Sequence, residues 1–118
     1  MIFNRFPQSP DLYAEDIKPI VAKTIERYGH DEWKAAVLVN EIHGHPCIYA
    51  IIGVKMGIKV LEYFGAKAGT VKIISSAGAV PPVSCMNDGL QVSTGATLGC
   101  GLIASPSGEV QRVLAIFV

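Results

Sequence analysis

The chain has 118 residues, which is enough for one domain with its own core and too short for two independent cores. Ten basic residues balance ten acidic ones, so there is no broad cationic surface for nucleic acid or anionic lipid. Only 17% of the residues are charged and 50% are hydrophobic, which predicts that part of the surface is covered in a homodimer or larger assembly.

The N-terminal residues carry none of the features of a secretory signal, and three cysteines cannot all pair within one chain. We therefore expect a cytoplasmic protein whose reduced thiols are free to bind metal or to react. The most apolar stretch, residues 48–64, is interrupted by Lys55 and Lys59 at helical spacing. This pattern predicts an amphipathic helix and not a membrane span.

Helices are expected in the first half of the chain. The first lies within residues 11–28, and its regular part starts near residue 15 because Pro19 fits only a first turn. A second helix is expected over residues 31–42, although its centre also contains strand-like valines. The third runs from about residue 46 to 64 and is closed by Gly65.

Strands are expected mainly in the second half. The alternating, β-branched segment 70–76 predicts a strand, and a short helix is expected over about residues 87–94, capped by Asn87 or Asp88. The C-terminal segments 102–104 and 110–118 predict an antiparallel hairpin. Helices first and strands later predict a single α+β domain over residues 1–118, in which N-terminal helices pack on a mainly antiparallel sheet.

The densest group of polar side chains is His43-Gly44-His45-Pro46-Cys47. In an extended segment, side chains two residues apart point the same way, so both imidazoles and the thiol can converge. Imidazole nitrogen and thiolate sulfur are the usual ligands of zinc. The alternative is that His45 caps the following helix, with Pro46 at its first position, while His43 lies on a surface loop.

Cys47 is expected within the first turn of that third helix. Backbone N–H groups at a helix N-terminus favour the thiolate, which would make Cys47 a ligand or a nucleophile with His45 or His43 as its base. The alternative is an inert, buried cysteine that acts as a small hydrophobic residue.

A second polar group runs from Cys85 to Gly101 and ends in a glycine-rich turn that also carries hydroxyl groups. Its composition suits a site but indicates no particular chemistry. Asp88 could equally be a helix cap, and Thr94 a turn residue.

With these two groups the chain resembles the E-subunit family of formylmethanofuran dehydrogenase. The family motifs are His-Gly-His-x-Cys-Pro-Gly and Cys-x-x-Asp-x-Ile-Gln-x-x-Thr-Gly-Cys-Thr-x-Gly-Lys-Gly-Asn. The first motif stands here as residues 43–47, followed by Gly53 and Gly57. The second stands as Cys85, Asp88, Leu90, Gln91, Thr94-Gly95, Thr97, Gly99 and Gly101. The resemblance covers roughly residues 40–105.

The chain departs from the family pattern mainly around the glycine-rich turn. Ile48-Tyr49 replaces Pro-Gly in the first motif. In the second, Ala96 stands in place of cysteine, Cys100 in place of lysine and Leu102 in place of asparagine. This chain resembles the core of the family. Many members also carry a cysteine-rich zinc domain after that core.

The resemblance implies an α+β core that dimerises, with a metal-associated pocket made from both motifs, and it places Cys85 beside the first motif. We therefore expect a divalent transition metal, most simply zinc, held by at least three of four ligands: His43, His45, Cys47 and Cys85. The expected pocket or cofactor-binding residues are Asp88, Gln91 and Thr94.

A binding or accessory role follows most directly from the resemblance. One alternative is an enzyme that uses Cys47 as a nucleophile or a metal-activated water, and another is a structural component of a larger redox complex. Gly53 and Gly57, one helical turn apart, are candidates for close contact between two copies of the chain.

Overall fold

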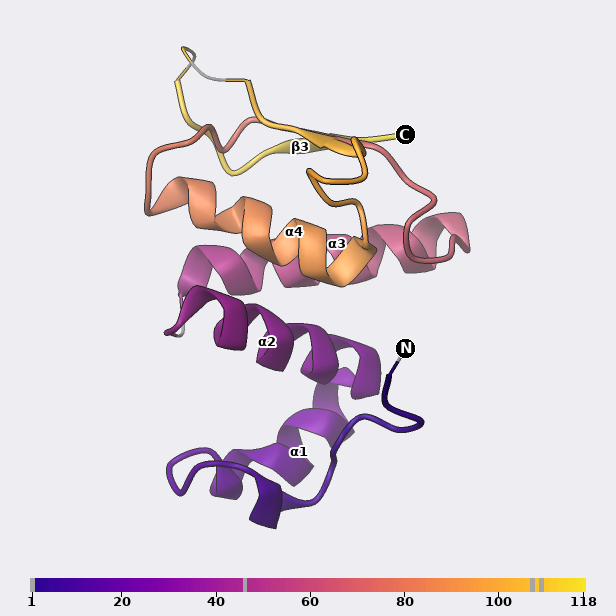
Figure 1. Cartoon of the computed structure of the whole chain (residues 1–118), viewed down its shortest axis with the longest axis vertical. Helices are drawn as coiled ribbons and strands as arrows, with labels where there is room; N and C mark the ends of the chain where they lie inside the picture. Colours follow the sequence, from indigo (N-terminus) through magenta and orange to yellow (C-terminus); the bar gives the residue numbers. More distant parts are fainter. Residues whose placement is uncertain (1, 46, 107, 109) are drawn as a thin grey trace.

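The computed structural model describes residues 2–45, 47–106, 108 and 110–118, and it stacks the helices in layers beneath a small sheet (Figure 1). The helical elements are η1 (Pro10–Leu12), α1 (Lys18–Tyr28), α2 (His30–His43), α3 (Ile48–Phe64), η2 (Val83–Cys85) and α4 (Met86–Thr94). The strands are β1 (Ile73–Ser75), β2 (Ile103–Ala104) and β3 (Ala115–Phe117). No helix in the described part of the chain is long and apolar enough to cross a membrane.

The sheet confirms the α+β class but has a different topology from the one expected. Its order is β2-β1-β3, with Ile73 paired to Ile103 in the parallel direction and Ile74 paired to Ile116 in the antiparallel direction. The expected C-terminal hairpin is therefore wrong, and the sheet is mixed and not mainly antiparallel. The reason is that β1 uses both of its edges and lies between the two C-terminal strands.

The observed helix boundaries agree with the expected ones more closely in the middle of the chain than at its start. α2 forms as predicted, despite its strand-like valines, whereas α1 begins only at Lys18 and keeps Pro19 in its first turn. α3 has Cys47, and not His45, as its N-cap residue; Pro46 lies outside the described residues. α4 begins at Met86 after a 3-10 turn, so the expected cap at position 87 or 88 is wrong.

Helices α3 and α4 run in the same direction and touch through glycines. A Cβ atom on Gly53 would lie 2.1 Å from the carbonyl oxygen of Met86, and one on Gly89 would lie 1.9 Å from that of Ala50. A Cβ on Gly57 would likewise meet the Ser93 side chain. Gly53 and Gly57 thus allow close contact within one chain, which removes the reason for placing them between two copies.

The core is divided between the two sides of α3. Buried residues of the sheet, of α4 and of the segments next to them form one cluster: Val71, Ile73, Ala77, Met86, Leu90, Ala96 and Ile103. A smaller cluster joins α2 to α3: Ala35, Val39, Ala50 and Val54. Because α3 is held from both sides, its first residues occupy a defined position beside the ends of α2 and α4.

Candidate metal centre

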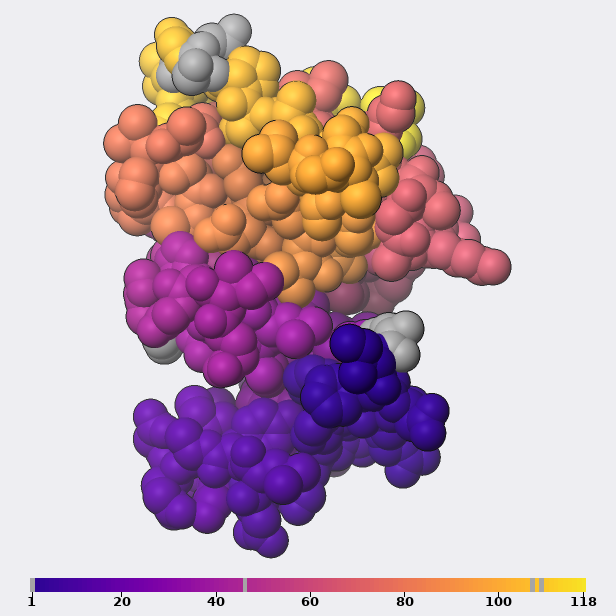
Figure 2. All heavy atoms as spheres, viewed as in Figure 1, coloured from indigo at the N-terminus to yellow at the C-terminus, as the bar shows by residue number. Residues whose placement is uncertain are grey.

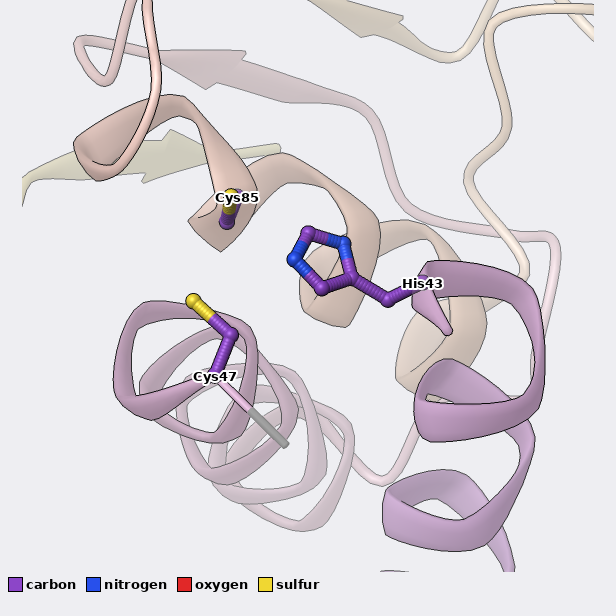
Figure 3. A group of neighbouring side chains, drawn as sticks. All are labelled: His43, Cys47 and Cys85. Atoms are coloured by element: carbon purple, nitrogen blue, oxygen red, sulfur yellow. The ribbon is translucent and has the colours of Figure 1, made fainter. Parts of the chain in front are cut away.

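Three helix ends meet at one point of the fold. His43 is the last residue of α2, Cys47 directly precedes α3, and Cys85 directly precedes α4. Their candidate ligand atoms all lie within 4.8 Å of one another, and Figure 3 shows the His43 ring pointing toward the two thiols. The parallel packing of α3 on α4 explains this arrangement, because it places the starts of both helices at the same end of the molecule.

The two ring nitrogens of His43 have different surroundings. Nδ1 lies 2.9 Å from Oδ2 of Asp88, on the first turn of α4. Nε2 is buried and has no hydrogen-bond partner among the described residues. A metal-binding histidine typically has one nitrogen held by a carboxylate and the other directed at the ion, and His43 matches both parts of that pattern.

The two thiols differ in their readiness to lose a proton. The backbone N–H of Ala50, at the start of α3, lowers the pKa of Cys47, and burial opposes this effect only in part. Burial raises the pKa of Cys85, and the neighbouring Cys47 raises it further. Cys47 is therefore the more acidic of the two thiols.

His45 lies outside this group of three. Its side chain is exposed, and its ring centroid is 4.5 Å from that of His43. It follows the left-handed turn at Gly44, which ends α2. A role for His45 as a fourth ligand or as a base stays a prediction.

The other expected pocket residues separate into two places. Asp88 contacts His43, as described above. Gln91 accepts a hydrogen bond from the Leu98 N–H at 2.9 Å, and Thr94 donates to the Leu90 carbonyl at 2.6 Å. Cys85 directly precedes α4 and Thr94 is its last residue, so the length of this helix, about 13 Å at about 1.5 Å per residue, separates them. Gln91 and Thr94 thus support the glycine-rich turn, and a cofactor-binding role for them stays a prediction.

Two of the altered family positions, Ala96 and Cys100, lie outside the group of three candidate ligands, whereas Ile48 and Tyr49 directly follow Cys47. Ala96 is fully buried in the core, which accounts for a small apolar residue there. Cys100 is exposed, and its backbone N–H donates to Oγ1 of Thr97. Cys100 is therefore a thiol of the same chain that can serve as a control for the other two.

Asn40, one turn before His43 on α2, is a polar residue of this region that the sequence motifs did not indicate. Its Oδ1 is buried without a hydrogen-bond partner among the described residues. Helical spacing could have indicated Asn40, because it follows Trp33 and Ala36 at intervals that place all three on one helical face.

Fold and site together define a small α+β protein with a candidate metal-binding group of one histidine and two cysteines. A family model, FmdE, described as "Molybdenum formylmethanofuran dehydrogenase operon", matches residues 42–110, a range that includes all three residues of the group. The chain belongs to this family, the proteins similar to the E subunit of formylmethanofuran dehydrogenase, and corresponds to its core domain.

A curated relative is described as a probable S-adenosyl-L-methionine-binding protein of Archaeoglobus fulgidus. It is 34% identical over 62 residues, which cover 51% of this chain and 17% of the relative. The chain thus spans only a small part of the length of that protein.

Proposed function

We propose that this protein is a cytoplasmic metal-binding member of its family, with a binding or accessory role, and that His43, Cys47 and Cys85 hold a divalent transition metal. The observation that carries this proposal is the environment of His43. Asp88 holds Nδ1, while Nε2 is buried beside two thiols with no other partner among the described residues. A metal ion would satisfy Nε2 and both sulfur atoms at once.

The donor set favours zinc. Two thiolates and one imidazole suit this borderline-soft ion better than the oxygen-preferring magnesium or calcium. Three protein ligands leave a fourth position open, a pattern typical of zinc sites that bind water or substrate, where the ion acts as a Lewis acid. His45, whose ring lies beside that of His43, is the candidate for closing that position.

Elemental analysis of protein purified without added metal tests this proposal. We expect about one equivalent of zinc per chain, retained at neutral pH and lost below about pH 6, because imidazole and thiol ligands bind metal only after losing their protons. Absence of every common divalent transition metal from the purified protein would overturn the proposed ligand set.

A second candidate function is an enzyme in which Cys47 is the nucleophile and His43 or His45 the base. The lowered pKa of Cys47, caused first by the Ala50 N–H, favours it. The same elemental analysis separates the two functions. A metal-free protein in which iodoacetamide modifies Cys47 far faster than the exposed Cys100 would support the enzyme.

Asp88→Asn is expected to weaken zinc binding by about 10- to 100-fold, because the carboxylate that orients a metal-binding imidazole contributes this much to affinity. Competition with a chromophoric chelator measures the change. Asp31→Asn is the matched control, since Asp31 lies in the first turn of α2, at the end opposite His43. Equal weakening in both variants would contradict a specific contact between Asp88 and His43.

We also propose a homodimer that uses the outer face of the sheet. Ile74 of the central strand β1 is paired with Ile116 of the edge strand β3, and the two side chains are 49% and 57% exposed. An apolar patch therefore lies on this face of the sheet and reaches its edge. The same face would suit a larger redox complex.

Light scattering is expected to show that the native protein is a dimer and that Ile116→Lys is a monomer. Tyr63→Lys, on the exposed end of α3, should remain dimeric; a monomeric native protein would refute the dimer.

A further inference from the structure

A cavity of about 370 Å³ lies between the N-terminal segment with α1, helix α2 and the start of α3. In Figure 2 the N-terminal segment and α1 form the indigo and purple lobe below α2. We propose that this cavity binds a small ligand with an apolar body and a cationic head. Binding would occur beside the metal centre but would not require metal.

The size and lining of the cavity suit an apolar body. Its volume falls within the range of small-molecule sites, about 300–1,000 Å³. Side chains from three elements form the apolar wall, among them Ile17 at the start of α1, Val37 of α2 and Ile51 of α3. Trp33 adds an aromatic surface and is only 6% exposed.

The polar groups of the aromatic wall are already satisfied. Trp33 Nε1 donates to Tyr13 Oη at 3.0 Å, and Tyr13 Oη donates to the Pro7 carbonyl at 2.5 Å. The rings are also in edge contact, with centroids 5.5 Å apart. These bonds hold the N-terminal segment against α2, so this side of the cavity is preformed.

The charges around the cavity favour a cation. Asp16 and Glu41 are exposed acidic residues of its lining. The described lining residues include no lysine or arginine, and His45 is the one imidazole among them. An ammonium head would gain attraction that a carboxylate head would lose. Cys47 also lines the cavity, so a bound ligand would end next to the candidate metal ligands.

Trp33 is the single tryptophan of the chain, so its fluorescence can follow occupancy of the cavity. We expect n-octylamine, added to the purified full chain, to change this fluorescence in a saturable manner. Octanoate has the same chain length and the opposite charge, and it should bind at least about 10-fold more weakly. No saturable change, or equal binding of the two probes, would overturn the proposal.

Two variants test the location. Ala36→Leu would fill the cavity and is expected to weaken octylamine binding at least about 10-fold, while Ala22→Leu, on an exposed position of α1 outside the lining, should bind normally. If Ala36→Leu does not fold by circular dichroism, Glu41→Gln replaces it, and the preference for octylamine over octanoate should shrink because an acidic lining residue is lost. Binding that is unchanged in the folded variant would refute this location.

A third variant separates this proposal from the metal site. Cys85→Ser removes a candidate metal ligand but no residue of the cavity lining. Octylamine binding that persists in this variant supports the cavity, whether or not the native protein contains metal. Binding that disappears with Cys85 would mean that the amine binds at the metal group, and it would overturn the proposal.

Discussion

Cys47→Ser is expected to remove the bound metal, whereas Cys100→Ser is expected to leave the metal content unchanged. The Cys47 thiol lies within 4.8 Å of the other two candidate ligand atoms, and its lowered pKa means that it loses its proton to a metal more readily than an ordinary cysteine does. Serine has nearly the same shape but is a much poorer ligand for a soft ion. Elemental analysis of the purified variants measures the difference.

Cys100 is the appropriate control because it has the same chemistry in a different place. It is exposed and lies outside the group of three. Cys85→Ser should behave like Cys47→Ser, although the raised pKa of Cys85 makes its deprotonation the more pH-dependent step. Equal metal loss from the Cys47 and Cys100 variants would show that the metal is bound elsewhere or without specificity.

Gly89→Ala is expected to destabilise the protein by about 2 to 4 kcal/mol. The added Cβ would lie 1.9 Å from the carbonyl oxygen of Ala50, which belongs to the backbone of a helix packed from both sides. Alanine favours a helix over glycine by about 1 kcal/mol, so the clash is expected to exceed the gain in helix propensity. Urea denaturation measures the change in the free energy of unfolding.

Gly99→Ala is the control for this substitution. Position 99 has no atom within 4 Å of an added Cβ and does not have a positive φ, so the change should stay within about 0.5 kcal/mol. A folded Gly89→Ala protein should also bind zinc more weakly than native protein, because spreading α3 from α4 separates Cys47 from Cys85. Equal stability of the two variants would contradict the close contact between these helices.

Local features of the sequence were sufficient to predict most of the helices. Local patterns predicted α2 and α3 nearly to their boundaries, with Gly65 marking the end of α3, because helical hydrogen bonds join residues only four apart. The motif at residues 43–47 also indicated metal chemistry from local sequence alone, because two of its donors, His43 and Cys47, are close along the chain. Family membership followed from the order of two such local motifs.

Contacts between distant residues decided the rest. Strand order depends on the pairing of residue 73 with residues 103 and 117, and no local pattern specified that β1 would lie in the centre. The sequence did not show which segment packs against Gly53 and Gly57. In the structure this segment is α4 of the same chain.

Tertiary contacts also decided which of the two histidines, His43 or His45, faces the thiols. The sequence by itself determined that imidazole and thiol groups would gather near the start of α3. Only the fold decided that His43 faces the thiols, because α2 continues through it and Asp88 of α4 holds its ring, while His45 lies exposed beyond the turn at Gly44. A helix fixes the direction of its last side chain through its backbone hydrogen bonds, and His45 lies beyond the bond from the Gly44 N–H to the Asn40 carbonyl that ends α2.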